Sequence, residues 1–131
     1  MQPEDVVDAL GRMIEAVKPD GLILDLQVIR PNARVELNGQ LVAEIDGEAL
    51  FRWADAATAA VDSRIRSGDL VEEAFDDHHV RQHYADGAEL VEDFAESKRR
   101  IPEERVPAIA AIKETLAVRE LCRLRRLRAR R

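Results

Sequence analysis

The sequence predicts one domain of 131 residues in the α+β class, with helices packed on a mostly antiparallel or mixed sheet of about five strands. An apolar stripe at helical spacing leads directly into an apolar run at 22–29, and the dipeptide Asn-Gly at 38–39 marks a hairpin soon after it. From residue 113 onward, apolar and cationic residues alternate, as they do in a half-buried strand. We therefore expect the element order α-β-β-β-α-β-α-α-β.

The first helix is expected from Pro3 to Lys18, because proline and acidic residues suit its first turn and Pro19 stops it. One face of this helix is apolar and contains Val6, Val7, Leu10, Met13, Ile14 and Val17. The strand that follows at 22–29 is too apolar for a strand with one solvated face. We expect it to be a central strand that is covered on both faces.

A hairpin is expected at 38–39, because both central residues of a type I′ turn need positive φ, which Asn and Gly tolerate. A two-residue loop sets Val35 opposite Val42 and Glu36 opposite Leu41, so neither face of the hairpin is cleanly apolar. This pattern suits a sheet edge or a lid.

The next helix is expected to begin after a cap at Asp46 and to stop at Gly68. Its small residues allow close packing on the sheet. The buried stripe contains Leu50, Ala54, Ala57, Val61 and Ile65, with Trp53 alongside.

Two later segments are expected to pair as strands. Residues 69–85 predict extended structure with a break near 76–77, because their apolar residues share no helical face. Residues 113–127 satisfy both the propensity for helix and the alternation of a strand, and we favour the strand. Antiparallel pairing of this strand with 69–77 would set arginines opposite acids.

Helices are expected between these two strands. Asp86 and Glu89 form a capping box that begins one helix, and the cationic segment 97–100 ends it. Two short helical turns follow over 102–112, because Pro107 must kink or restart the helix.

The sequence AVKPDG followed by LILDLQV, within residues 16–31, resembles one part of the class I S-adenosylmethionine-dependent methyltransferases. That part is the fourth helix, the turn and the fifth strand, where the usual sequence in the family is close to VLKPGG, followed by a hydrophobic strand. In the family, a glycine-rich turn and an acidic residue hold the cofactor, and both precede the matching part. The resemblance therefore implies the carboxyl-terminal part of such a fold without the cofactor-binding half, and no GxGxxG motif occurs.

The net charge of −6 is unevenly distributed. Residues 119–131 hold seven arginines and one glutamate, which gives them a charge of +6, while the rest of the chain carries −12. An acidic body repels nucleic acid and anionic lipid, and no apolar run approaches the ~20 residues that a membrane span needs. With one cysteine and an acidic amino terminus, the sequence predicts a cytoplasmic protein with no nucleic-acid or membrane partner.

Residues that could carry chemistry are few. His78, His79 and His83 follow two aspartates, which suggests a metal site. On a helix His79 and His83 could share an ion, but on the strand that we expect they lie ~13 Å apart, so we expect solvated or packed histidines. We expect Cys122 to be a buried structural thiol. No catalytic or phosphate-binding signature is complete, so we expect no metal and no cofactor, and we lean against an enzyme.

Five residues are candidates for ligand binding: Asp25, Gln27, Arg30, His83 and Tyr84. Asp25 and Gln27 interrupt the central strand on one face, where buried polar side chains need partners. In the resembled family, residues after the corresponding strand often border the substrate pocket. The structural alternative is a polar face paired with an arginine such as Arg30.

Two functions remain open from the sequence. The first is a noncatalytic, methyltransferase-like module that acts by self-association as a homodimer, or by pairing with a separate chain that supplies the cofactor half. The reason is that a sheet with few strands leaves an exposed edge or apolar face. The alternative is a small-molecule-binding domain, or an enzyme of unrecognised type, with a pocket near Asp25, Gln27, His83 and Tyr84.

Overall fold

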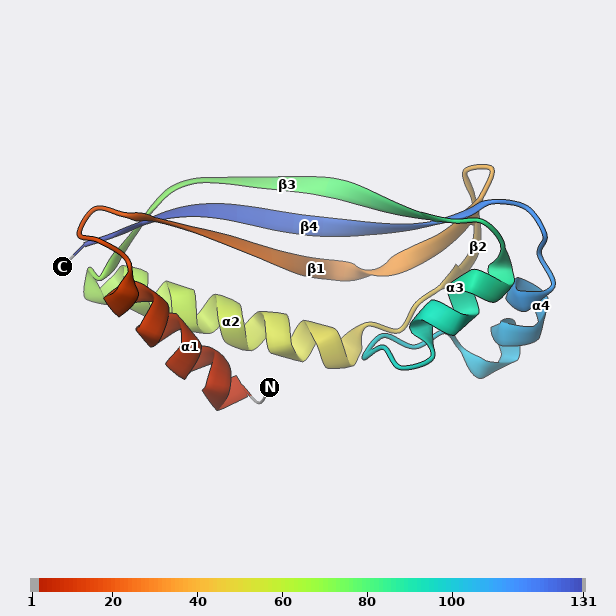
Figure 1. Cartoon of the computed structure of the whole chain (residues 1–131), viewed down its shortest axis with the longest axis horizontal. Coiled ribbons are helices and arrows are strands. Elements are labelled where there is room, and N and C mark those ends of the chain that lie inside the picture. Colours follow the sequence, from red (N-terminus) through yellow and green to blue (C-terminus); the bar gives the residue numbers. More distant parts are fainter. Residues whose placement is uncertain (1–2, 131) are drawn as a thin grey trace. The chain divides into compact units, whose positions relative to one another are not determined.

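The computed structural model describes the backbone of residues 3–130 and the side chains of residues 8–130. The predicted packing of Val6 and Val7 therefore lies outside the described residues. The elements, which Figure 1 labels except for η1, are α1 (Pro3–Ala16), β1 (Leu22–Leu37), β2 (Gln40–Glu44), α2 (Glu48–Ser67), β3 (Leu70–Tyr84), α3 (Gly87–Phe94), the 3₁₀-helix η1 (Glu103–Arg105), α4 (Val106–Ala110) and β4 (Leu116–Ala129).

Within the described residues the strands form one open antiparallel sheet in the order β2-β1-β4-β3. This arrangement confirms the predicted α+β class and the predicted strand at the end of the chain. The sheet has four strands because the two strands predicted at 22–29 and 34–37 are one continuous strand, β1. β2 is an edge strand, which is one of the two places that the sequence predicted for the hairpin.

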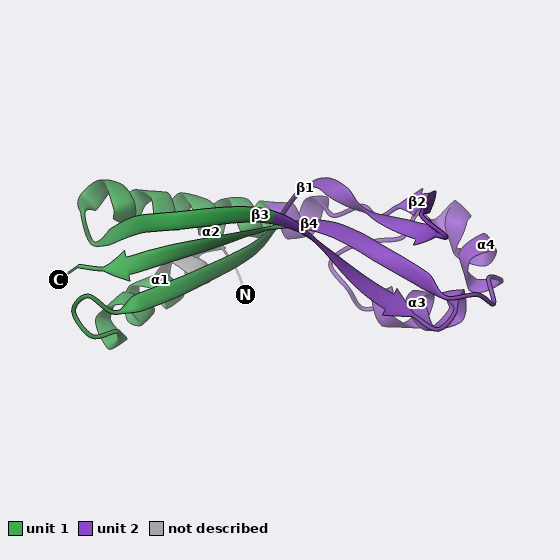
Figure 2. Ribbon diagram, turned by 90° about the horizontal axis from the view of Figure 1, so that it is seen from above, with its two compact units in different colours: residues 1–28, 52–77, 122–131 green, residues 29–51, 78–121 purple. Residues whose placement is uncertain are grey.

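Contacts between residues divide the chain into two compact units, coloured in Figure 2. Unit 1 contains residues 1–28, 52–77 and 122–131, and unit 2 contains residues 29–51 and 78–121. The long strands β1, β3 and β4 contribute residues to both units. Each unit has its own hydrophobic core.

In unit 1, the helices α1 and α2 pack on one face of β1, β4 and β3, and Figure 1 shows both helices on the same side of these strands. The middle of the predicted stripe of α2 is buried at Ala54, Ala57 and Val61, whereas Leu50 and Ile65 at its ends are half-buried. The small side chains of this stripe let the helix approach the sheet closely. The core contains Leu10, Ile14, Ile23, Ala60, Val61, Leu70, Leu127 and Ala129.

In unit 2, α3 and α4 touch each other closely at Gly87. A Cβ atom at this position would lie 1.6 Å from the carbonyl oxygen of Ile109, so only glycine fits between the two helices. The side chain of Asp86 caps α3 by accepting a hydrogen bond from the backbone N–H of Glu89 at 2.9 Å, which confirms half of the predicted capping box. The core contains Ala33, Val35, Ala43, Ile45, Tyr84, Leu90, Phe94, Ile109, Leu116 and Val118.

The turn between β1 and β2 and the end of α2 lie where the sequence predicts them. Asn38 and Gly39 join β1 to β2 with φ values of 52° and 79°, and Gly68 ends α2 with a φ of 88°. Positive φ is unstrained for glycine and tolerated by asparagine, which explains why these residue types occupy these positions.

Four expectations need correction, the first of which concerns β3. This strand is continuous from Leu70 to Tyr84, without the break predicted at 76–77. The reason is that an arginine of β4 holds one of the two aspartates: Arg123 Nε donates to Asp77 at 2.7 Å. Paired in this way, adjacent acids do not interrupt a strand.

The hairpin register and the end of α3 also differ. Glu36 is opposite Leu41 as predicted, but the register shifts beside it, so that Val35 is opposite Ala43 and both of these side chains are buried. This irregularity gives the hairpin an apolar inner face. α3 ends at Phe94, before the cationic segment predicted to end it, because hydrogen bonds of 3₁₀ type tighten the chain from Ala95 onward.

The fourth correction concerns the amino-terminal half of β1, which is not covered on both faces. Leu22, Leu24 and Leu26 are 45%, 64% and 59% exposed, whereas Ile23 between them is 4% exposed. Alternate residues of a strand point to opposite faces. Because α1 and α2 both pack on the face of Ile23, the described part of unit 1 leaves the other face bare.

Candidate binding pocket and association surface

The five predicted site residues do not line a single pocket. Asp25 and Gln27 line a pocket of unit 1. His83 lines a different pocket in unit 2, together with Glu36 and Arg81. Tyr84 belongs to the hydrophobic core of unit 2.

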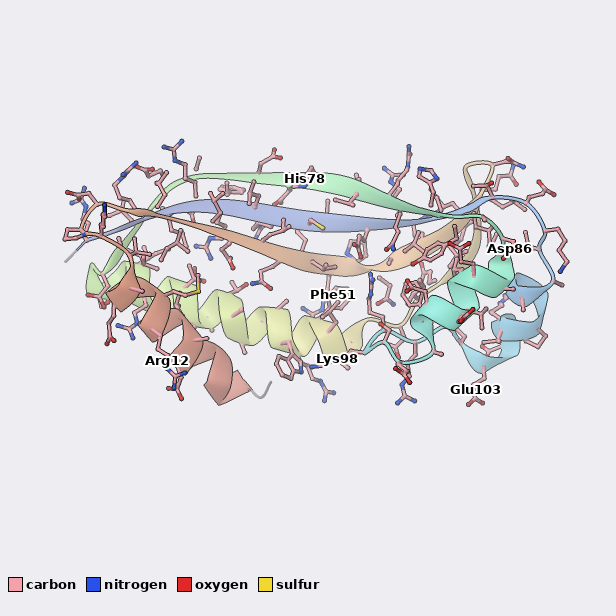
Figure 3. The ribbon with its side chains drawn as sticks, viewed as in Figure 1. Arg12, Phe51, His78, Asp86, Lys98 and Glu103 are labelled. Atoms are coloured by element: carbon pink, nitrogen blue, oxygen red, sulfur yellow. The ribbon has the colours of Figure 1, made fainter. Side chains whose placement is uncertain are left out.

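Arg30 has a structural environment in unit 2. Its guanidinium Nη2 lies 3.3 Å from Glu48 Oε1, at the start of α2. The same guanidinium lies over the ring of Phe51 at 5.0 Å from the ring centre, which is a cation–π arrangement. Phe51, labelled in Figure 3, is buried in the first turn of α2, so Arg30 ties the middle of β1 to that helix.

Tyr84 is likewise held by its surroundings. Its hydroxyl group donates a hydrogen bond to Asp93 Oδ2 on α3, and its ring packs against Phe94 with centroids 6.3 Å apart. Burial, together with the hydrogen bond to Asp93, raises the pKa of the Tyr84 hydroxyl well above its ordinary value of 10.0. The group therefore stays protonated at neutral pH and joins β3 to α3.

The Asp25 pocket, as we call the pocket of unit 1, has a volume of about 160 Å³ and lies between α1, α2 and β1. Asp25 and Gln27 reach it because they share a strand face with Ile23, and this face packs against the two helices. The pocket is lined by Ala9, Leu10, Met13, Ile23, Leu24, Asp25, Gln27, Ala57, Val61 and Leu127.

The Asp25 carboxylate is only half satisfied. Oδ1 accepts a hydrogen bond from Gln27 Nε2 at 2.8 Å. Oδ2 is shielded from water and accepts no hydrogen bond from the described residues. A buried acceptor without a donor costs roughly 1 to 3 kcal/mol, so a partner that donates to this oxygen would remove an unfavourable term.

The leucine face, by which we mean Leu22, Leu24 and Leu26, is next to an open strand edge. β4 pairs with one edge of β1, while β2 pairs with the other edge only at Arg34–Leu37. Among the described residues, no strand pairs with residues 22–28 on that second edge. Within the described residues, unit 1 thus leaves residues 22–28 of β1 with one bare face and one bare edge.

A network of arginines and acids joins β4 to its other neighbour. We call it the arginine network, and it consists of Arg123, Arg125, Arg126 and Arg128 with Asp62, Glu72, Glu73 and Asp77. It confirms the predicted antiparallel pairing of the arginine-rich strand with the acidic start of β3. The sequence did not predict Asp62, because this partner of Arg125 lies on α2 and no periodicity connects it with β4.

The protonation equilibria of the arginine network follow from its contacts. Hydrogen bonding to Arg128 holds the pKa of the Glu73 carboxyl below its ordinary value of 4.5. Burial disfavours the charge on Arg125, but hydrogen bonds to Asp62 and Glu72 outweigh burial and raise the pKa of the guanidinium. Glu73 and Arg125 are therefore charged at neutral pH.

The remaining chemical groups are spread over the chain. Cys122 is a buried thiol of β4, and the three histidines lie on β3, where Figure 3 labels His78. No group of three or more His, Cys, Asp or Glu side chains suited to a metal ion occurs in the part of the chain that the structure describes. None of the described helices is both long and apolar enough to cross a membrane.

Comparison of the chain with protein-family models, with curated proteins and with solved structures finds no match. The resemblance to methyltransferases thus stays a prediction from residues 16–31. Function has to be argued from the Asp25 pocket, the leucine face and the open edge beside it.

Proposed function

We propose that the chain is a noncatalytic module that acts by self-association, with residues 22–28 of β1 pairing with the same residues of a second copy. The observation that supports this most is the leucine face beside an unpaired strand edge in unit 1. An unpaired edge presents a row of N–H and C=O groups that another strand can bond, and exposed apolar patches mark association surfaces.

The register of the pairing follows from the leucines. A two-fold axis perpendicular to the sheet keeps the leucine faces of both copies on the same side of the joined sheet. Centred on Leu24, antiparallel pairing sets Leu22 opposite Leu26 of the partner subunit, and Leu24 opposite Leu24 of the partner subunit. Centred on Asp25, it would set two carboxylates directly opposite each other, which is unfavourable. The register centred on Leu24 is therefore preferred.

The strength of this interface follows from the exposed area of the leucines. Burying a whole leucine contributes about 1.5 to 3 kcal/mol, and these side chains are about half exposed in one copy. Each leucine therefore contributes about 1 kcal/mol on association. Six leucines and a short strand pairing must offset the entropy of association, so we expect a dissociation constant in the micromolar range.

The test is sedimentation velocity of the full chain between about 5 and 200 µM, for the wild type and for two variants. Leu24→Lys removes the central leucines and sets two lysines opposite each other, so it should weaken the dimer at least tenfold. Leu41→Lys changes a leucine of β2 that is 47% exposed, and it should leave the dimer unchanged. Both substitutions are at exposed positions and should leave the fold of the monomer intact.

Either of two results would overturn the proposal. One is a wild-type chain that sediments as a monomer of 14.8 kDa throughout this range, in which case a separate partner chain becomes the alternative occupant of the edge. The other is a dimer that Leu24→Lys does not weaken, because the interface would then lie elsewhere.

A further inference from the structure

We infer that the Asp25 pocket binds a small ligand with an apolar body and one N–H donor, preferably an ammonium group. Among the residues that line the pocket, Leu24 alone also belongs to the leucine face. The inference rests on Asp25 and on the side chains of α1 and α2, so it does not depend on self-association. It rests on the volume of the pocket, on its lining, and on the unsatisfied oxygen of Asp25.

The volume limits the size of the ligand. The pocket measures about 160 Å³, close to the engineered apolar cavity of about 150 Å³ that is known to bind benzene. A single six-membered ring with a one-carbon substituent is therefore the appropriate scale. All residues that line the pocket belong to unit 1, so its shape depends on one packed core.

The lining fixes the chemical class of the ligand body. Leu10, Met13, Ile23, Val61 and Leu127 surround the pocket with hydrocarbon and one thioether. Such a lining favours an apolar ring or a short alkyl chain over a sugar or a phosphate, whose polar groups would lose their hydrogen bonds to water.

The polar end of the pocket fixes the functional group of the ligand. Gln27 Nε2 already donates to Asp25 Oδ1 at 2.8 Å, which orients the carboxylate. Oδ2 is left without a donor, and because it is shielded from water, a ligand reaches it through a rotation of the Asp25 side chain toward the pocket. A ligand ammonium group would supply that hydrogen bond and an opposite charge together, and charge-assisted bonds of this kind are the stronger ones. A ligand carboxylate would instead be repelled by the carboxylate of Asp25.

The probe that tests this inference is benzylamine, with toluene and phenylacetate as comparison ligands of the same size. Binding to the full chain is followed by the ¹³C methyl signals of Met13, Ile23 and Val61 in NMR titrations at neutral pH. We expect benzylamine to shift these signals with an affinity at least tenfold higher than that of toluene, and phenylacetate to cause no shift.

Three variants make the test specific. Asp25→Asn should lower the affinity for benzylamine at least tenfold and remove the preference over toluene. Asp55→Asn, at an exposed carboxylate of α2 outside the pocket, should bind benzylamine as the wild type does. Ala57→Leu adds volume to the pocket wall and should abolish binding of both benzylamine and toluene.

Two outcomes would overturn the inference. The first is the absence of methyl shifts with about 10 mM benzylamine, which corresponds to binding weaker than the millimolar range. The second is an Asp25→Asn variant that binds benzylamine as tightly as the wild type. If Ala57→Leu fails to fold, the comparison between Asp25→Asn and Asp55→Asn still decides the matter.

Discussion

Replacing Arg125 by methionine should destabilise the protein more than the same change at an exposed arginine of the arginine network. The side chain of Arg125 is 9% exposed, and its guanidinium donates hydrogen bonds to Glu72 at 2.7 Å and to Asp62 at 2.9 Å. Methionine keeps much of the apolar stem, so the change removes charge with little loss of packing. Two carboxylates then remain without the cation that they share.

The loss in the free energy of unfolding caused by Arg125→Met should lie between two limits. Removing one partner of a fully buried ion pair costs about 3 to 5 kcal/mol, whereas an exposed pair contributes about 0 to 1 kcal/mol. Here the arginine is buried, but Asp62 and Glu72 are 43% and 29% exposed, so water solvates part of their charge. We expect a loss of about 2 kcal/mol, which is a decrease of about 1 M in the urea midpoint for a typical slope.

Urea unfolding followed by circular dichroism, at one fixed protein concentration, measures this loss. Arg126→Met is the matched control, because the side chain of Arg126 is 52% exposed and its loss should cost less than about 0.5 kcal/mol. Adding Asp62→Asn to Arg125→Met should recover part of the loss, since it removes repulsion between the two carboxylates. Equal midpoints for Arg125→Met and Arg126→Met would refute the reasoning.

Three further predictions follow from the described contacts. Tyr84 is the only tyrosine of the chain, and because its pKa is raised, the folded protein should show no tyrosinate absorbance near pH 10. The free energy of unfolding should fall as pH rises above 10, because only the unfolded state ionises there. A titration midpoint near 10 in the folded protein would contradict this prediction. The isolated chain should bind S-adenosylmethionine more weakly than ~100 µM by calorimetry, since the motif that holds the cofactor is lacking. Duplex DNA should not bind at ~0.15 M salt, because the chain's own acids neutralise arginines such as Arg123 and Arg128; salt-dependent binding would count against that explanation.

Local signals in the sequence were sufficient for most elements of the fold. The dipeptide at 38–39 marks a turn because positive φ restricts the residue types that can occupy it. The arginine-rich end of the chain is a strand, as its alternation indicates, although its propensity also suits a helix. In both cases the decisive constraint acts within a few residues, so one sequence contains it.

The sequence did not show in the same way which helices pack on each face of a strand. The run at 22–29 is largely apolar, and the sequence records this apolarity but not how many helices are present to bury it. Both helices of unit 1 pack on the face of Ile23, which leaves the leucine face bare. For the same reason, the sequence placed Asp25 and Gln27 on one face but could not supply Met13, Ala57 and Val61 from two helices to complete the pocket.

The most direct test of self-association through β1 is an isotope-filtered NOE experiment on a dimer formed from equal amounts of ¹³C-labelled and unlabelled chains. The register centred on Leu24 predicts intermolecular NOEs between the methyl groups of Leu22 and Leu26, and between the Leu24 methyl groups of the two copies. Intermolecular NOEs that arise from β3 and not from the leucine face, or none at concentrations where the chain sediments as a dimer, would contradict the proposal.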